Sequence, residues 1–301
     1  MKKTLLIIGC GDIALRTALL LNKHYRVLGL TRRAENFKKL RSYQIIPILG
    51  DLDQPASLKR LSGIADTVLH LAPPPNMGLK DTRTRHLLAA LSRQYFRAKG
   101  RIPHRLLYIS TSGIYGDWGG KWVREYSSVN PYNDRAWRRL DAEQQIRKWG
   151  RCTGCHVTLL RVPGIYAADR LPVARIKQGT PTLIAEEDSY TNHIHADDLA
   201  RIIVAALHFG KMGRIYNTCD DSSLKMGDYF DLVADAFKLP HPPRISRAQA
   251  KEQIPASLLS FMEESRRLAN DRMKRELRIK LLYPTVYEGI SKVISDKNGL
   301  R

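Results

Sequence analysis

Short apolar runs alternate with amphipathic segments along the first two thirds of the chain. Apolar runs of strand length predict six buried strands, and apolar residues recurring every three or four positions predict four helices between them. Strands that alternate with helices in this way predict an α/β fold with a doubly wound parallel sheet. The expected strands are Leu5–Ile8, Tyr25–Leu30, Thr67–Leu71, Leu106–Ser110, Val157–Arg161 and Arg214–Asn217, and the expected helices are Ile13–Asn22, Thr82–Lys99, Arg135–Lys148 and Asp198–Leu207.

Two glycines stand at the turn between the first expected strand and the first expected helix. Gly9 permits the tight turn, Gly11 leaves no side chain in the way of a phosphate, and Ala14 lets the helix pack close to the sheet. The free N–H groups and the positive dipole end of the helix then face a pyrophosphate. In this setting the pattern predicts a dinucleotide on a Rossmann fold, bound by Gly9, Gly11, Asp12 and Ile13.

The end of the second expected strand indicates which dinucleotide is bound. An acidic residue there binds the ribose 2′-hydroxyl of NAD, but this chain has Thr31, Arg32 and Arg33. A guanidinium group pairs with a 2′-phosphate through charge-assisted hydrogen bonds. We therefore expect NADP, bound by Thr31, Arg32 and Arg33, with NAD as the alternative. If the two arginines are only solvated, this preference does not follow.

After Arg161 the regular alternation loosens and prolines interrupt short segments. This change predicts a smaller C-terminal substrate lobe beside the sheet. Residues 1–165, completed by about 196–220, are expected to form the dinucleotide-binding domain, and residues 166–195 and 221–301 the substrate-binding lobe. Ligands of such sheets bind at the carboxyl ends of the strands, so the substrate is expected between the two parts.

The charge of the chain is strongly positive. Lysine and arginine number 50 against 29 aspartate and glutamate residues, a formal net charge of +21. Such a field attracts phosphates, on small molecules or on nucleic acid. The basic residues are scattered, with a denser stretch from Arg266 to Lys280, and no zinc finger, basic zipper or RNA-recognition pattern is present. Nucleic acid is therefore the less favoured partner, and a basic surface that only aids solubility is the alternative.

Other patterns bear on location and on metals. The apolar runs are far shorter than the roughly 20 residues that a bilayer span needs, and the one after Lys3 is broken by Gly9 without a cleavage site. We expect a cytoplasmic protein without a membrane partner. Cys152 and Cys155 form a C-x-x-C, but no second pair of ligands accompanies them. No metal is expected.

Several segments in this order resemble the extended short-chain dehydrogenase/reductase family, the NAD(P)-dependent epimerase/dehydratase group. They are Gly50-Asp51-Leu52, His70-Leu71-Ala72, Ser110–Gly116, Leu160–Tyr166 and His193–Ala200. The resemblance implies that the first is the acidic turn near the adenine, the second lies beside the cofactor, and the third is the catalytic serine/threonine segment. It therefore implies cofactor contacts at Asp51, Leu52, Leu71 and Ala72, and catalytic roles for Thr111 and Ser112.

The family's active site needs a tyrosine and a lysine four residues apart on one helical face. The lysine lowers the pKa of the phenol from about 10, and the phenol then exchanges a proton with the substrate. Alignment on Asn130 and Glu143 puts Arg135 and Arg139 at these positions. Arg139 keeps the positive charge and a bond to the cofactor ribose. Arg135 cannot release a proton, so the proton relay must differ from that of the family.

One tyrosine–lysine pair with the right spacing does occur, Tyr95 and Lys99. It precedes the Thr111 segment, whereas the family's pair follows it. We interpret Tyr95 as part of an apolar helix face and Lys99 as solvated. Aromatic and basic residues near the expected cleft are candidates for the substrate pocket, namely Trp118, Trp122, Arg124 and Tyr190.

The favoured hypothesis is an NADP-dependent oxidoreductase or epimerase-like enzyme for a small polar or sugar-linked substrate. The main alternative is a non-catalytic NADP-binding sensor or scaffold, and a nucleic-acid binder is less favoured. The family resemblance also implies a possible homodimer through the helices Thr82–Lys99 and Arg135–Lys148. The many arginines of the second helix argue against a dry interface.

Overall fold

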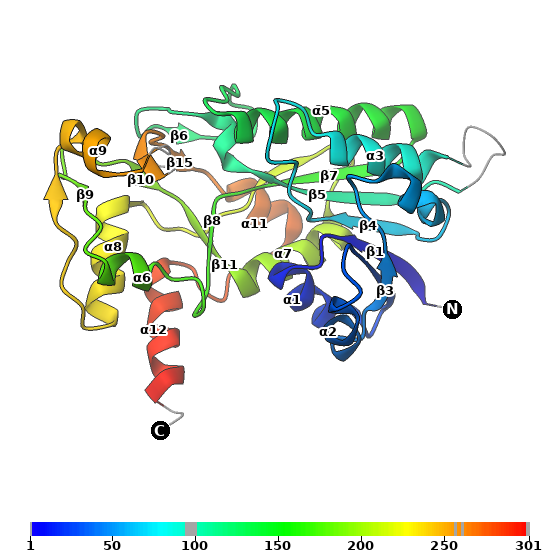
Figure 1. The fold of residues 1–301 in the computed structure, drawn as a ribbon, viewed down its shortest axis with the longest axis horizontal. Helices are drawn as coiled ribbons and strands as arrows, with labels where there is room; N and C mark the ends of the chain where they lie inside the picture. The colour runs from blue at the N-terminus through cyan, green and yellow to red at the C-terminus, as the bar shows by residue number, and fades with distance from the viewer. Residues whose placement is uncertain (1, 94–100, 256–257, 260–261, 299–301) are drawn as a thin grey trace.

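Seven parallel strands form the central sheet of the protein, in the order β12-β7-β5-β4-β1-β2-β3 (Figure 1). The computed structural model describes residues 2–93, 101–255, 258–259 and 262–298. The direction in which successive strands are added to the sheet reverses between β1 and β4. A ligand crevice is expected at such a switch point. The strands are β1 (Lys3–Ile8), β2 (Tyr25–Thr31), β3 (Ile46–Leu49), β4 (Thr67–His70), β5 (Arg105–Thr111), β7 (His156–Val162) and β12 (Ile215–Asn217).

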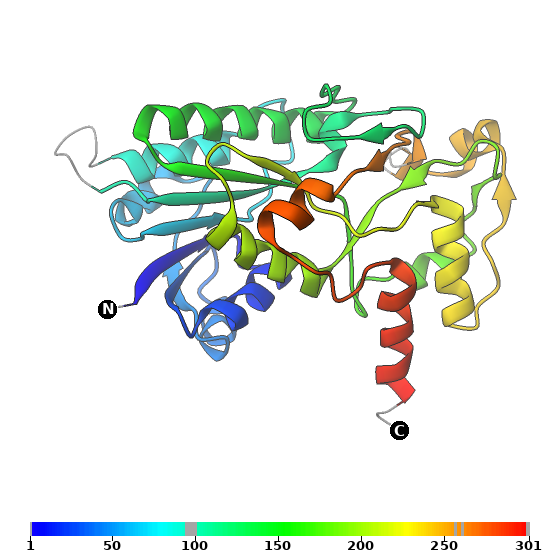
Figure 2. The same cartoon turned by 180° about the vertical axis from the view of Figure 1, so that it is seen from behind.

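Helices cover both faces of this sheet (Figures 1 and 2). On one face lie α1 (Asp12–Leu21) and α7 (Ala196–Phe209), and on the other lie α3 (Thr82–Ser92) and α5 (Asp134–Thr153). Successive residues of β1 alternate between the two apolar cores: Leu5 and Ile7 belong to one, Leu6 and Ile8 to the other. This burial on both sides explains why the strand is a continuous apolar run and does not alternate with polar residues.

The six strands and four helices expected from the sequence are confirmed, with bounds that shift by a few residues. The helix expected to reach Lys99 is described as far as Ser92, and the Tyr95–Lys99 pair lies outside the described residues. In the first 50 residues, the helix α2 (Asn36–Ser42) and the strand β3 were not predicted. Pro47 argues against a strand, but β3 pairs only with β2 at the sheet edge, where a proline is tolerated.

A second group of elements gathers beyond the carboxyl ends of the strands (left in Figure 1). Its helices α6, α8 and α12 share an apolar cluster around Tyr166, Ile176, Phe230 and Ile290, separate from the cores that flank the sheet. The group comprises β8 (Gly164–Tyr166), α6 (Val173–Lys177), β9 (Thr182–Leu183), β10 (Tyr190–Thr191), β11 (His193–His195), β13 (Leu224–Lys225), α8 (Met226–Ala236), β14 (Arg244–Ile245), α9 (Arg247–Gln253) and α12 (Val286–Asn298).

Between these elements the chain returns to the central layer. β15 (Arg267–Leu268) pairs with β6 (Trp122–Val123), and α11 (Asp271–Leu277) lies against α7 and β12. Short 3-10 turns, η1 (Pro55–Leu61) and η2 (Ser112–Tyr115), follow β3 and β5. The division of the chain at residues 165 and 221 stays a prediction. Among the described residues, no helix has the length and apolar character needed to cross a membrane.

Candidate functional site

The turn after β1 is shaped by two glycines with different surroundings. Gly9 has a φ of +94°, and a Cβ placed on it would lie 2.5 Å from the backbone nitrogen of Ala72. Gly11 caps the N-terminus of α1, and a Cβ there would meet nothing within 4 Å. The turn is therefore pressed against the end of β4, while open space remains in front of the helix N-terminus. The residues present fit a bound pyrophosphate, which needs this space.

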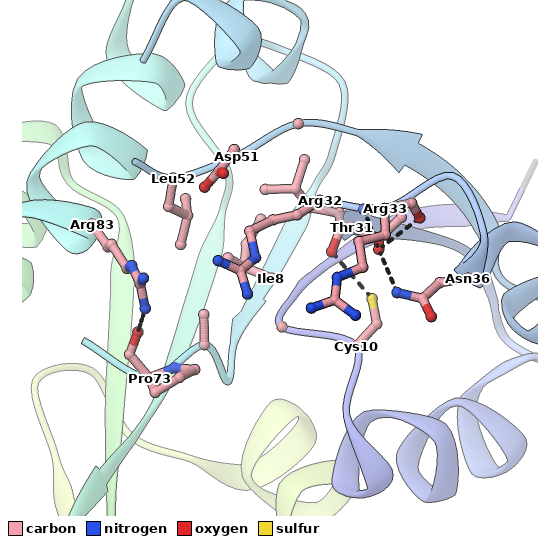
Figure 3. A pocket seen from close by; sticks show the side chains of 14 residues that line it. Ile8, Cys10, Thr31, Arg32, Arg33, Asn36, Asp51, Leu52, Pro73 and Arg83 are labelled. Atoms are coloured by element: carbon pink, nitrogen blue, oxygen red, sulfur yellow. Dashed lines mark hydrogen bonds between the residues drawn. The ribbon is translucent and has the colours of Figure 1, made fainter. Parts of the chain in front are cut away.

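A cavity of about 270 Å³ opens beside this turn, between the ends of β1, β2 and β4 (Figure 3). We name it the dinucleotide cavity. The structure brings together in its lining most of the residues expected to bind cofactor. These are Gly9, Thr31, Arg32, Arg33, Asp51, Leu52 and Ala72.

The other five expected cofactor residues are not in the described lining of this cavity, and one of them, Arg139, lines a second cavity at the end of β5. Gly11 and Asp12 begin α1, and Ile13 and Leu71 pack, partly buried, against the apolar core. The Asp12 carboxylate is 2.9 Å from Arg16 and 3.3 Å from Arg170, which balance its charge. A carboxylate beside a pyrophosphate would otherwise repel it.

The outer part of the dinucleotide cavity is basic. In Figure 3 the side chains of Arg32 and Arg83 extend toward its middle from opposite sides, and Arg33 extends beside Arg32. The turn that carries Arg32 and Arg33 is held by Thr31. The Thr31 hydroxyl accepts hydrogen bonds from Arg33 N–H at 3.4 Å and from Asn36 Nδ2 at 3.2 Å. This geometry suits a phosphate on the cofactor ribose.

Arg83 lines the dinucleotide cavity although sequence reasoning did not identify it. Its Nε and Nη2 donate to Asp53 at 2.9 and 2.7 Å, and its Nη1 donates to the carbonyl oxygens of Pro73 and Pro74. The hydrogen bonds from Arg83 hold the pKa of Asp53 below its ordinary value. Arg83 therefore braces the loop after β4 against the loop after β3. No motif marks this role, because it depends on contacts across 30 residues of chain.

A second cavity, of about 410 Å³, lies where β5 ends; we name it the Thr111 cavity. Its lining includes Thr111, Ser112, Arg135 and Arg139, so the structure brings together the segment and the two helix positions that the sequence suggested. Pro73 lines both cavities. The two cavities therefore adjoin, with Arg32 in the lining of one and Thr111 in the lining of the other.

The polar groups at the end of β5 are held by backbone contacts. The Thr111 hydroxyl accepts a hydrogen bond from Gly113 N–H at 3.2 Å, so its own hydrogen is left for donation to another oxygen. Ser112 is buried beside it. Arg139 Nη1 donates to Tyr108 Oη at 3.0 Å and to the carbonyl oxygen of Ile109 at 2.9 Å. These contacts fix the Arg139 guanidinium over the end of β5.

Helix α5 places its arginines by its start and by one buried ion pair. Asn133 caps it by accepting a hydrogen bond from Ala136 N–H at 3.0 Å. Positions 135, 138 and 139 then share one face, because residues three and four apart on a helix are neighbours. Deeper along the helix, Glu143 pairs with Arg161 of β7 at 2.8 Å, with both side chains at most 4% exposed. This pair locks the helix against the sheet.

Several further residues of the Thr111 cavity come from distant parts of the chain. Arg138 lies on α5, and Glu264 and Arg266 precede β15. Of the four residues expected near the substrate, Tyr190 lines this cavity, whereas Trp122 and Arg124 line a separate hollow and Trp118 packs in an apolar cluster. The basic stretch that begins at Arg266 is visible in the sequence, but its place in the cavity is not.

Comparison with known proteins assigns the chain to a family. Residues 14–219 match the sequence model of the NAD dependent epimerase/dehydratase family. The chain belongs to this family. Membership makes a nicotinamide dinucleotide the expected cofactor of this epimerase/dehydratase-family protein and agrees with its seven-stranded Rossmann sheet. The resemblance inferred from the sequence is thereby confirmed.

Curated relatives match part of the chain. A trifunctional UDP-glucose 4,6-dehydratase/UDP-4-keto-6-deoxy-D-glucose 3,5-epimerase/UDP-4-keto-L-rhamnose-reductase of Arabidopsis thaliana is 24% identical over 154 residues. The match covers 48% of this chain and 22% of that relative. This epimerase/dehydratase-family protein therefore spans about a fifth of the relative's length.

Solved structures match over nearly the whole chain. A conserved protein of unknown function from Silicibacter pomeroyi superposes with a TM-score of 0.80 at 27% identity, covering 98% of this chain and 99% of its own. UDP-glucuronic acid 4-epimerase from Bacillus cereus, solved with UDP-glucuronic acid and NAD, gives a TM-score of 0.76 at 19% identity, covering 99% and 100%. At 19% identity, the similarity to the Bacillus cereus epimerase shows a shared fold.

Proposed function

We propose that the protein is an NADP(H)-dependent oxidoreductase or epimerase-like enzyme that acts on a small polar or sugar-linked substrate through an altered proton relay. The observation that carries the proposal is that the two cavities adjoin at Pro73, which lines both of them. A dinucleotide with its adenosine end at Arg32 extends toward Thr111, beside which a substrate has room. The sugar-nucleotide enzymes among the relatives and structural neighbours support this substrate class.

The cofactor preference is the first expected result. Arg32 and Arg33 line the dinucleotide cavity, where Asp51 is the single carboxylate among the described lining residues. A charge-assisted guanidinium–phosphate contact contributes about 1.5–3 kcal/mol, so NADP+ should bind at least tenfold more tightly than NAD+. Calorimetric titration of the whole chain with both dinucleotides measures this. Arg32→Ala and Arg33→Ala should each weaken NADP+ binding while NAD+ binding stays the same. Equal or tighter NAD+ binding by the unaltered protein would contradict the proposal.

The residues of the Thr111 cavity have distinct expected roles. A bound nicotinamide supplies hydride transfer to or from a substrate carbon. The Thr111 hydroxyl donates a hydrogen bond to the substrate oxygen, and Arg139 holds positive charge where the oxygen gains negative charge. Arg135 does not deliver the proton that a reduced carbonyl oxygen must take up, because a guanidinium group stays protonated. That proton must come from water or from another group at the cavity.

A second candidate function is an NADP-binding sensor or scaffold without turnover. The observation in its favour is that arginine occupies both helix positions beside Thr111. An enzyme of this kind is expected to turn over a substrate at a rate that depends on Thr111. A sensor would bind NADPH tightly and leave its oxidation rate unchanged by any sugar or sugar acid, so the stimulated oxidation rate separates the two functions.

A further inference from the structure

The Thr111 cavity carries far more positive than negative charge. Its described lining includes four guanidinium groups and one carboxylate. One carboxylate balances one guanidinium, and holding several like charges together in a partly buried site is costly. The residues concerned are Arg135, Arg138, Arg139, Arg266 and Glu264.

The carboxylate of Glu264 is already engaged. Its Oε2 lies 2.8 Å from Arg266 Nη1, with both side chains about a tenth exposed, and its Oε1 accepts a hydrogen bond from Asn133 at 3.2 Å. Arg138 Nη1 donates to a neutral acceptor, the carbonyl oxygen of Gly78. The Arg139 guanidinium likewise donates to a phenol and a carbonyl oxygen. These neutral acceptors orient the guanidinium groups but do not balance their charge.

Two buried N–H groups in this lining have no acceptor within the part of the chain that the structure describes. They are the Nε atoms of Arg138 and Arg266, two residues that are 7% and 8% exposed. Partial desolvation of the guanidinium group and the charges of the neighbouring Arg139, Arg138 and Arg266 lower the pKa of Arg135, against the opposing effect of Glu264. The described lining therefore holds buried hydrogen-bond donors without an acceptor and more positive than negative charge.

We infer that the substrate presents a phosphate or carboxylate group to this cavity, where Arg135, Arg138 and Arg266 bind it. Arg135 and Arg138 approach from α5, and Arg266 comes from the segment before β15, so the anion bridges the two walls beside Thr111. Guanidinium forks match both groups well. The substrate class is therefore a small sugar phosphate or sugar acid, and the cavity of about 410 Å³ is of a size for small molecules.

A neutral sugar at this position would leave the excess positive charge of the described lining unbalanced. Its affinity should therefore be lower than that of a charged sugar. The inference deepens the proposed function and rests on it in taking the Thr111 cavity as the substrate site. The inference does not depend on where the adenosine end of the cofactor binds. The preference for a charged sugar and the affinity for the dinucleotide can therefore be measured separately.

Matched charged and neutral sugars test the inference. Calorimetry on the whole chain, with and without NADPH, would compare glucose 6-phosphate and glucuronate with glucose, and would include inorganic phosphate as the simplest anion. At least one charged sugar should bind about tenfold or more tightly than glucose, as one or two charge-assisted contacts predict. Whichever charged sugar binds more tightly, glucose 6-phosphate or glucuronate, identifies phosphate or carboxylate as the recognised group. Equal binding of glucose and both charged sugars overturns the inference.

Variants of α5 test whether the preference for a charged sugar arises from the arginines of the Thr111 cavity. Arg135 is exposed at the cavity, so Arg135→Gln should fold and lower the affinity for the charged sugar about tenfold, with Arg135→Lys restoring part of it. Arg147→Gln removes the same charge from an exposed position of the same helix outside the cavity and should change nothing. An equal loss in Arg147→Gln would show a general charge effect and overturn the assignment.

The two proposals fail in different ways. Binding of NADPH without discrimination between charged and neutral sugars overturns the inference and leaves the proposed function standing. Discrimination without NADPH binding supports the inference and overturns the proposed function.

Discussion

Replacing Gly9 by alanine is expected to destabilise the protein by about 2–4 kcal/mol, because a side chain is strained at a positive φ and its Cβ overlaps backbone. The residue has a φ of +94°, and the added Cβ would lie 2.5 Å from Ala72 N and 2.7 Å from Ala72 Cα. Neither atom belongs to a flexible side chain, so β1 and β4 must move apart at their carboxyl ends. Urea unfolding of the two proteins measures the difference.

Gly11→Ala is the matched control and should give the opposite pattern. Its added Cβ meets nothing within 4 Å, and its φ of −81° suits any residue. The fold should lose less than about 1 kcal/mol, the cost of a poorer N-cap residue. NADPH affinity should nevertheless fall at least about tenfold, because the methyl group takes the space in front of the first N–H groups of α1. Unchanged NADPH binding in a folded Gly11→Ala variant would place the pyrophosphate elsewhere.

Replacing Arg135 by tyrosine and Arg139 by lysine together is expected to raise the turnover of a neutral-ended sugar nucleotide, UDP-glucose, by about 100-fold or more. Both positions line the Thr111 cavity. A phenol four residues before a lysine has a cation to lower its pKa and can exchange a proton with the substrate, which a guanidinium cannot do. The change also lowers the excess of positive over negative charge in the described lining of the cavity. The rate of nicotinamide reduction with UDP-glucose and NADP+ measures the gain.

The single variants separate the two contributions. Arg135→Tyr alone and Arg139→Lys alone should each give less than the double variant, because the phenol and its neighbouring cation act as a unit. The unaltered protein should show weak or no turnover of UDP-glucose. Rapid turnover that survives Thr111→Val would show that the reacting atoms lie outside the Thr111 cavity.

The sequence predicted the inner part of the site better than its outer walls. The glycine turn and Arg32 were found because they follow predicted strands directly, and the carboxyl ends of parallel strands meet at one edge. Asp51 was found through the family resemblance, because the strand before it was not predicted. Arg83 and Arg266 reach their cavities from positions that no local pattern marks. Their placement depends on how loops and the C-terminal elements pack, and single-chain periodicity carries no information about that packing.

The edge strand β3 shows the same limit within the fold. A proline inside a short apolar run argues against a strand when only local preference is considered. The pairing of Leu28, Gly29, Leu30 and Thr31 with residues 46–49 overrides that preference. Which side of a strand stays unpaired is a property of the sheet as a whole, so the sequence alone does not supply it.

The loop that joins the two cavities is stiff before any ligand arrives. Pro73, Pro74 and Pro75 each have a fixed φ, and Arg83 holds the first two by their carbonyl oxygens while it is itself anchored to Asp53. A segment restrained in this way loses little conformational entropy when a dinucleotide settles along it. This wall of the binding site is therefore preorganised, and the affinity for the cofactor is not reduced by a need to order the loop.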